Sequence, residues 1–230
     1  MKVANPEYLK TVDIPEGTAG DFSIKRIIIT DEQVSMHNLR CAINDQMDRR
    51  LTPGTYTQLC EKNRIWMSDT PAEQIDHAEF VDMAQKHVLI TGLGIGMVAA
   101  ACLRKPGVKS VTVIERQPEV IQLVAPSLQK LAAENGKPLT VIEADAMKWM
   151  PTQKFDMAWH DIWPDICADN EAGMDQIMEH YRPWVNFGQS CWCEEMVREL
   201  AEADHLQDIY RQRLFPDLKS TLKEVDGIKL

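Results

Sequence analysis

One segment fixes the architecture of this chain: His87-Val88-Leu89-Ile90-Thr91-Gly92-Leu93-Gly94-Ile95-Gly96-Met97-Val98-Ala99-Ala100-Ala101. Its apolar first part predicts a strand, and its small residues after Gly96 predict a helix. Between them, glycine occupies every second position, which permits positive φ angles and the close approach of a ligand. The helix beyond offers free N–H groups and the positive end of its dipole. The segment therefore predicts a strand–loop–helix unit whose loop faces a bound ligand.

A carboxylate at the end of the next strand indicates what this ligand contains. Glu115 lies 23 residues after Gly92, where a carboxylate can accept hydrogen bonds from ribose hydroxyls. Dinucleotide folds carry G-x-G-x-x-G, but Met97 stands at the third glycine position here and Gly96 comes one residue early. The pattern favours S-adenosylmethionine over NAD. The alternatives are a tight turn that binds nothing and a solvated carboxylate at the strand end.

The rest of the chain after residue 84 alternates between strands and helices. Five short apolar runs predict strands: Val88–Thr91, Ser110–Ile114, Leu139–Glu143, Phe155–His160 and Gln189–Cys193. A helix starts at Pro118 and ends at Asn135-Gly136, with Pro126 expected to kink or split it. This alternation predicts an α/β fold with a Rossmann-like, doubly wound and mostly parallel sheet. After Cys193 we expect only one or two helices before Leu214, and a frayed segment 219–230.

The first 84 residues predict a small N-terminal α+β segment, followed by a cofactor-binding domain over 85–230. A strand is expected at Ile24–Thr30 and a helix at Asp31–Arg50, with Asp31 as its N-cap. Thr55–Cys60 and Arg64–Met67 read as a hairpin. A short helix is expected from Pro71 onward. These N-terminal strands provide one way to complete the edge of the main sheet.

Acidic side chains follow the predicted third and fourth strands as well. Asp145 and Asp161 come directly after them. The carboxyl ends of parallel strands meet at one sheet edge, and ligands bind there at the switch in strand order. We therefore expect the glycine loop, Glu115, Asp145 and Asp161 to converge on one site. Asp145 could instead cap a helix beginning at Met147.

From Val88 to about Cys193 the chain resembles class I S-adenosylmethionine-dependent methyltransferases, and among them the spermidine-synthase-like branch. The resemblance implies that the cofactor, S-adenosylmethionine, is bound by Gly92, Leu93, Gly94, Gly96, Glu115, Arg116, Asp145 and Ala146. It implies that Asp145 accepts from the adenine amino group and that Ala146 offers its backbone N–H. A small β-rich segment before the cofactor domain also fits this branch in general arrangement.

The loop His160-Asp161-Ile162-Trp163-Pro164-Asp165 follows the fourth strand. Spermidine synthases carry there an aspartate that binds and deprotonates an attacking amine, and then Asp-Pro. Asp161 matches the first aspartate and is the predicted catalytic residue, whereas Asp165 follows Pro164 instead of preceding it. Amino-methyltransferases of nucleic acid place the aromatic residue and the prolines in another order.

The same loop supplies the predicted substrate-binding residues His160, Trp163 and Asp165. Trp163 can stack on a flat group or embrace a cation, or it can fill the core. His160 is a candidate base, but a neutral packed histidine is the favoured alternative. No metal is expected, because no Cys/His ligand spacing occurs.

Composition narrows the function classes. The 230-residue chain has a formal net charge of −10, which disfavours binding to long phosphate backbones. No secretory signal or membrane span is expected, and the six cysteines read as free thiols, so the expected compartment is the cytoplasm.

The sequence thus predicts a methyltransferase that acts on a small molecule at an amine, and a homodimer is one expected assembly. Two alternatives stay open. One is an aminopropyltransferase that uses decarboxylated S-adenosylmethionine, and the other is a non-catalytic cofactor-binding protein of the same fold.

Overall fold

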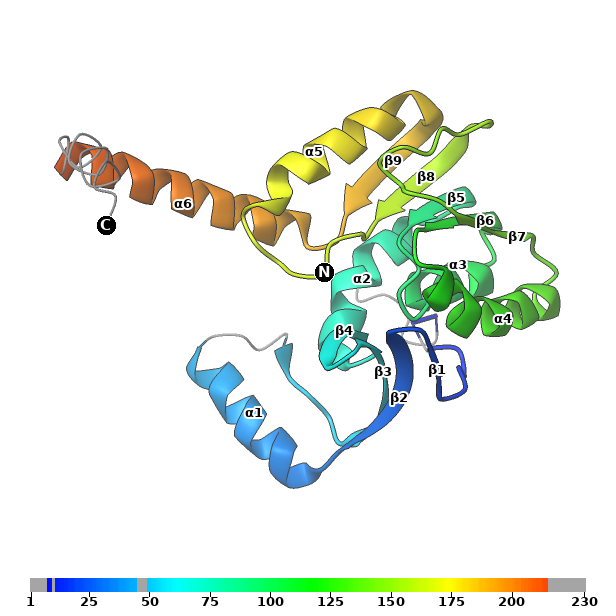
Figure 1. The fold of residues 1–230 in the computed structure, drawn as a ribbon, viewed down its shortest axis with the longest axis horizontal. Helices are drawn as coiled ribbons and strands as arrows, with labels where there is room; N and C mark the ends of the chain where they lie inside the picture. The colour runs from blue at the N-terminus through cyan, green and yellow to red at the C-terminus, as the bar shows by residue number, and fades with distance from the viewer. Residues whose placement is uncertain (1–7, 10, 45–48, 215–230) are drawn as a thin grey trace, which may run out of the picture.

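The computed structural model describes residues 8–9, 11–44 and 49–214, with side chains up to 207, and contains two sheets (Figure 1). The larger sheet has five parallel strands in the order β7-β6-β5-β8-β9. They are β5 (Lys86–Thr91), β6 (Val108–Glu115), β7 (Leu139–Glu143), β8 (Phe155–His160) and β9 (Val185–Cys191). This is the predicted Rossmann-like α/β fold. Its strand order reverses between β5 and β8, which is where such sheets bind ligands.

Helices cover both faces of this sheet, as its apolar strands require. On one face, the core includes residues of α2 (Pro71–Met83), α3 (Met97–Arg104) and α4 (Pro118–Glu134). On the other face it includes α5 (Asn170–Tyr181), which the 3₁₀ turn η2 (Arg182–Trp184) connects to β9. Neighbouring residues of β5 alternate between the two cores, so the central strand is buried on both sides.

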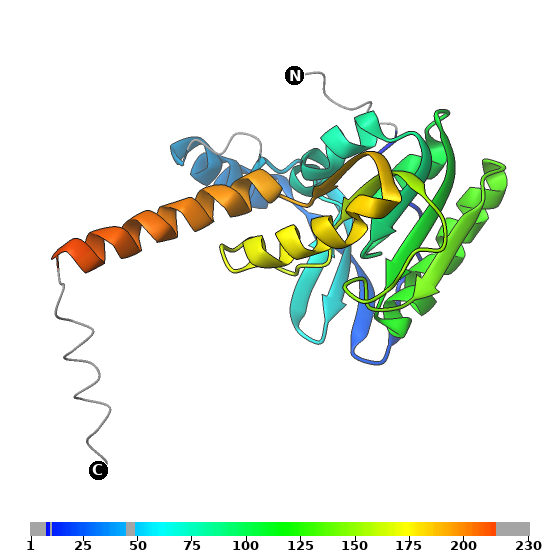
Figure 2. The same cartoon turned by 90° about the horizontal axis from the view of Figure 1, so that it is seen from above.

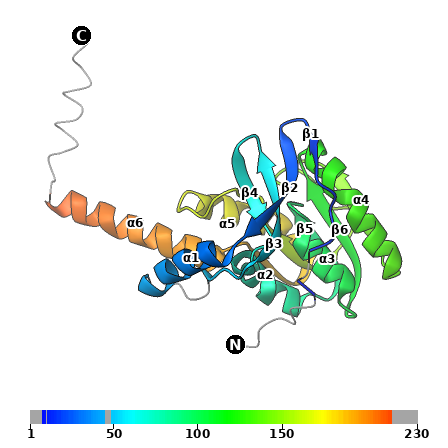
Figure 3. The same ribbon diagram turned by 90° about the horizontal axis from the view of Figure 1, so that it is seen from below.

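The N-terminal strands form a sheet of their own and do not complete the edge of the parallel sheet. It contains β1 (Gly17–Ala19), β2 (Phe22–Ile29), β3 (Gly54–Glu61) and β4 (Arg64–Ser68), all antiparallel. The β3–β4 hairpin is the predicted one. Phe22, Ile24 and Leu59 join the core that contains α3 and α4, and Figure 3 shows β1 and β2 beside α4. The division at residue 84 into two domains stays a prediction.

Two predicted boundaries, the cap of the first helix and the bounds of the last strand, are wrong, and of the two effects predicted for Pro126 the split is absent while the kink stays a prediction. The first helix, α1 (Asp31–Ile43), is capped by Thr30 and not by Asp31. The Thr30 hydroxyl accepts from the Gln33 N–H, and the Gln33 side chain accepts from the Thr30 N–H, so the two residues form a capping box. Pro126 does not split α4, since the buried stripe on both sides of it keeps the helix packed. Strand β9 begins at Val185 and ends at Cys191, and Cys193 has φ 51°.

After β9 the described residues form one helix, α6 (Glu194–Leu214), which extends away from the body of the molecule (Figures 1 and 2). Up to residue 214 the parallel sheet therefore has five strands and gains no closing antiparallel hairpin. The predicted fray at 219–230 lies outside the described residues. None of the helices described is both long and apolar enough to span a bilayer.

Candidate functional site

The loops after β5 and β8 touch each other at the switch in strand order. The Asp161 N–H donates to the Thr91 carbonyl at 2.8 Å. A Cβ atom on Gly92, whose φ is +90°, would lie 1.8 Å from the Asp161 carbonyl oxygen. Only glycine fits this contact, so the glycine loop and the predicted catalytic residue are held together by their backbones.

The other two glycines of the loop face different neighbours. Gly96 has φ +72°, and a Cβ there would come within 2.8 Å of Leu128, so this glycine lets α3 and α4 approach closely. Gly94 has φ +50° and faces Met67 of β4, whose Sδ accepts from the Ile95 N–H at 3.2 Å. The N-terminal sheet therefore lies over the glycine loop.

Glu115 is buried at the end of β6 and is tied to the same loop. Its carboxylate accepts from the Leu93 N–H and from the Gln117 N–H, both at 2.8 Å. Its side chain is not a solvated carboxylate, because the residue is only 8% exposed. Each carboxylate oxygen keeps a further lone pair, and Glu115 still lines the adjoining pocket.

A pocket with about 910 Å³ of empty space, its open mouth included, lies at this sheet edge. Its lining includes the predicted site residues Gly92, Gly94, Glu115, Arg116, Asp145, Ala146, Asp161 and Trp163. Leu93 and Gly96 are not in the lining: the Leu93 N–H donates to Glu115, and Gly96 packs against Leu128. The lining also includes Glu73 and Trp192, which were not predicted as site residues. They come from α2 and from the turn after β9, and local sequence patterns do not bring these elements together.

Asp145 starts a turn, not the helix that the alternative interpretation required. Its Oδ1 accepts from the Met147 N–H at 3.0 Å, and its Oδ2 pairs with Lys148 at 3.0 Å. The hydrogen bond to Lys148, followed by the Met147 N–H, lowers the pKa of Asp145, so the carboxylate is charged at neutral pH. Asp145 is thus a charged acceptor in the pocket lining, two residues beyond Glu143, the register partner of Glu115.

Asp161 lies in an electrostatically unfavourable place for a charge. Burial, followed by repulsion from Glu73, Asp76 and Glu115, raises its pKa to about 7. Burial also raises the pKa of Glu73, although hydrogen bonds from Ser68 oppose this. A carboxyl group that titrates near neutral pH inside a pocket is suited to exchange protons with a ligand.

His160 and Asp165 lie outside the pocket lining, so the structure does not bring these two predicted substrate-binding residues to the pocket wall. His160 is fully buried, accepts or donates hydrogen bonds with Thr91 at 3.0 Å and Gln189 at 3.3 Å, and stacks on Tyr181. Burial lowers its pKa to about 4, so it is the neutral packed histidine. Asp165 is exposed and pairs with Arg64 of β4, since the residue order after Pro164 turns it outward.

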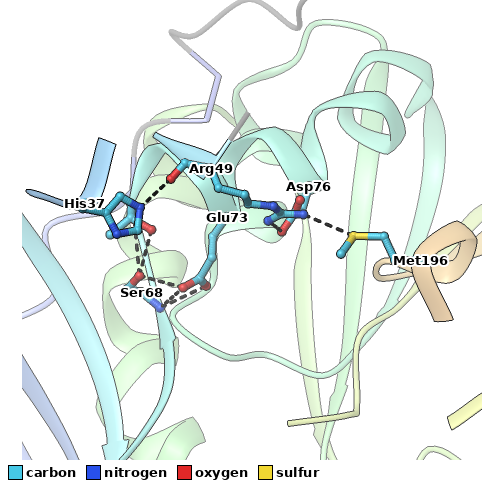
Figure 4. A network of polar contacts seen from close by, with 7 residues as sticks. His37, Arg49, Ser68, Glu73, Asp76 and Met196 are labelled. Atoms are coloured by element: carbon cyan, nitrogen blue, oxygen red, sulfur yellow. Dashed lines mark hydrogen bonds and ion pairs between the residues drawn. The ribbon is translucent and has the colours of Figure 1, made fainter. Parts of the chain in front are cut away.

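A polar network behind the pocket fixes α2 (Figure 4). Arg49 donates to Asp76 at 2.7 Å and approaches the Met196 sulfur of α6 at 3.2 Å. Glu73, one turn earlier on α2, accepts from the Ser68 N–H and hydroxyl. Among the described residues no group of three or more His, Cys, Asp or Glu side chains is arranged to hold a metal ion.

Glu115→Ala is expected to weaken binding of the nucleoside cofactor by roughly 1.5–3 kcal/mol, the usual scale for hydrogen bonds to a charged group. The variant also frees the Leu93 N–H, so the glycine loop loses an anchor. Calorimetric titration measures the loss. Glu143→Ala is the matched control, because Glu143 is the register partner of Glu115 on β7 but is exposed. Equal affinities for both variants would remove Glu115 from the binding site.

No family model matches the chain, and no curated protein matches it. Solved structures resemble parts of it. One is a DhpI–SAM–HEP complex, with 18% identity over 44% of this chain and 42% of that chain and a TM-score of 0.33. A dimethyladenosine transferase from Plasmodium falciparum has 25% identity, coverages of 43% and 32% and a TM-score of 0.33. Trm5b from Pyrococcus abyssi has 17% identity, coverages of 65% and 44% and a TM-score of 0.42.

This chain spans less than half the length of each of these structures. Similarity at such TM-scores carries no argument about activity. The assignment of a function therefore depends on the residues of the pocket.

Proposed function

We propose that this protein is a class I S-adenosylmethionine-dependent methyltransferase of the spermidine-synthase-like type that methylates a small-molecule amine. The observation that carries the proposal is the contact of the glycine loop with two pocket residues, Glu115 through the Leu93 N–H and Asp161 through its backbone. The first pair suits a nucleoside cofactor, and Asp161 suits an acceptor that must lose a proton.

The residues present fit the cofactor. Glu115 offers lone pairs to ribose hydroxyls, Asp145 offers an acceptor to the adenine amino group, and Ala146 offers its backbone N–H. Arg116 and Met147 line the same end of the pocket. The positive-φ glycine loop provides the close approach that the methionine end requires. When bound, S-adenosylmethionine supplies an electrophilic methyl group, whose bond electrons leave on sulfur as the new N–C bond forms.

The protein's own part in the reaction is to align the acceptor, exclude water and remove a proton. Asp161 is the proposed proton acceptor and Trp163 the proposed wall for the apolar part of the amine. The net charge of −10 supports a small-molecule acceptor over a nucleic acid. A cytoplasmic location and a possible homodimer belong to the same proposal.

Aminopropyl transfer is the second candidate, and the charges of the pocket favour it. Among the lining residues, carboxylates come from Glu73, Glu115, Asp145 and Asp161, whereas the one cationic side chain is Arg116. Arg116 directly follows Glu115, at the end proposed for the nucleoside. A methionine carboxylate near the glycine loop would depend on backbone N–H groups, and that of Ile95 already donates to the Met67 sulfur. Decarboxylated S-adenosylmethionine has no such need.

Parallel calorimetric titrations with S-adenosylmethionine, its decarboxylated form and NAD test the cofactor. We expect one of the two sulfonium compounds to bind and NAD to have no measurable affinity. Binding of NAD alone would overturn the proposal. Release of S-adenosylhomocysteine with a panel of amines then tests the chemistry, and cofactor binding without turnover on any amine would favour the non-catalytic alternative.

A further inference from the structure

We propose that Glu73 is the second anionic group of the pocket, which acts with Asp161 to hold the acceptor as an ammonium ion while Asp161 takes up the proton that the acceptor loses. This inference deepens the proposed function and rests on it. Glu73 lies on the first turn of α2, the helix that connects the N-terminal sheet to the parallel sheet.

The position of Glu73 is not explained by helix capping. Thr70-x-x-Glu73 has the spacing of a capping box, but Thr70 makes no side-chain cap and Glu73 does not bond to the Thr70 N–H. Its Oε1 instead accepts from the Ser68 hydroxyl at 2.6 Å and from the Ser68 N–H at 2.9 Å. The N-terminus of α2 thus has no side-chain cap, and Ser68 instead holds the Glu73 carboxylate at the pocket wall.

A buried donor faces the partner carboxylate. The Trp159 side chain is 4% exposed, and its Nε1–H makes no hydrogen bond within the part of the chain that the structure describes. It lies close enough to Asp161 to lower the pKa of that carboxyl group, without adopting hydrogen-bond geometry. The Trp159 N–H therefore favours the charged form of Asp161 and opposes part of the repulsion from the neighbouring carboxylates.

The charges around the pair favour a cationic ligand. Asp161 is faced by Glu73 and Asp76 of α2 and by Glu115 of β6. Its charge also contributes to raising the pKa of Cys191, the last residue of β9, and of Cys193 in the turn that follows, although burial is the main cause. Arg49 is occupied by Asp76. Repulsion between the carboxyl groups is relieved either by a proton or by an ammonium group placed between them.

Aromatic side chains bound the same space. Trp66, Trp163 and Trp192 all line the pocket. The Trp66 N–H is directed away to Glu61 at 3.1 Å, and Trp163 packs on Gly173 of α5. Indole rings attract organic cations, so the pocket suits an ammonium group that carries an apolar substituent better than a neutral hydroxyl compound.

Asp161 and Glu73 together account for the proton and the charge in the transfer step. An N–H bond of the bound ammonium breaks, its electron pair stays on nitrogen as the nucleophile, and the proton moves to the Asp161 carboxylate. Glu73 keeps the second negative charge that holds the cation, and the two groups titrate as one coupled unit. Removal of the Glu73 charge therefore lowers the pKa of Asp161.

Benzylamine and its uncharged analogue benzyl alcohol test the pair, by calorimetry from pH 6 to pH 9 with S-adenosylhomocysteine present. We expect the wild-type protein to bind benzylamine at least ten times more tightly than the alcohol, with affinity rising through about pH 7. Glu73→Gln should weaken benzylamine binding at least tenfold and move this midpoint to lower pH. Ser68→Ala should move it to higher pH, because the lost hydrogen bond raises the pKa of Glu73.

Glu79→Gln is the matched control, since Glu79 is an exposed residue of α2, and it should behave as wild type. Thermal unfolding verifies that every variant folds. An unmoved midpoint in Glu73→Gln, or equal binding of amine and alcohol by the wild type, overturns this inference. Failure of the proposed function has a different signature: S-adenosylhomocysteine does not bind, while benzylamine, titrated alone, still distinguishes Glu73→Gln from wild type.

Discussion

Asp161→Asn is expected to lower turnover by about 10²–10⁴-fold, the usual range for a positioned acid–base group, and to leave cofactor affinity nearly unchanged. Asparagine keeps the shape of the side chain and loses the charge. The backbone of Asp161 holds the Gly92 loop, and the substitution does not alter it. Steady-state kinetics with the best amine found, together with cofactor calorimetry, measure both effects.

The pH dependence of turnover gives this prediction a second readout. Because Asp161 has a pKa of about 7 and acts as the base, kcat/KM of the wild type should fall as the pH drops below 7. Asp161→Asn should lack this acidic limb. Asp169→Asn, which changes an exposed aspartate at the start of α5, should keep both the rate and the limb. Undiminished turnover in Asp161→Asn excludes the catalytic role, and an equal loss of cofactor affinity makes Asp161 a binding residue.

Asp161→Asn should also stabilise the fold at alkaline pH. The folded pKa of Asp161 is raised above its unfolded value, so the wild type loses stability as the pH rises from about 4 through 7. The neutral amide avoids the repulsion from Glu73, Asp76 and Glu115. The melting temperature of the variant should exceed that of wild type at pH 8 and match it more closely at pH 5. A lower melting temperature at pH 8 would contradict this account of the pKa.

The parallel sheet and the glycine loop could be predicted because their signals are local. Each signal is a short apolar run followed by Gly92, Glu115, Asp145 or Asp161, and it spans only a few residues. A parallel sheet then brings these strand ends to one edge without further information. The wrong predictions also have local causes. Thr30, and not Asp31, caps α1, and packing on both sides of Pro126 keeps α4 continuous.

The acceptor side of the pocket could not be predicted in the same way. Glu73 and Trp192 reach it from elements that meet only in the folded chain. The pattern Thr70-x-x-Glu73 is typical of a helix cap, and nothing in the sequence shows that the carboxylate turns to Ser68 instead. His160 and Asp165 illustrate the opposite case. They neighbour Asp161 in sequence, but one side chain points into the core and the other to solvent.

Gly94→Val is expected to abolish measurable cofactor binding while the fold survives. At φ +50° a β-branched residue is strained by about 1–2 kcal/mol, and its Cβ would lie 2.3 Å from the flexible end of Met67. Met67 can move aside, so the protein folds. The valine side chain and the displaced thioether then both occupy the space that the glycine loop leaves for the ligand.

Backbone strain and obstruction of the ligand can be separated by a second glycine. Gly136 has φ +63° and nothing within 4 Å of a Cβ atom, at the end of α4 and outside the pocket lining. Gly136→Val therefore carries comparable strain without blocking the site, and calorimetry should find its cofactor affinity equal to that of wild type. If a folded Gly94→Val also binds with unchanged affinity, the ligand lies elsewhere. If both variants lose binding equally, the loss comes from strain in the fold, and the glycine loop does not approach the cofactor as proposed.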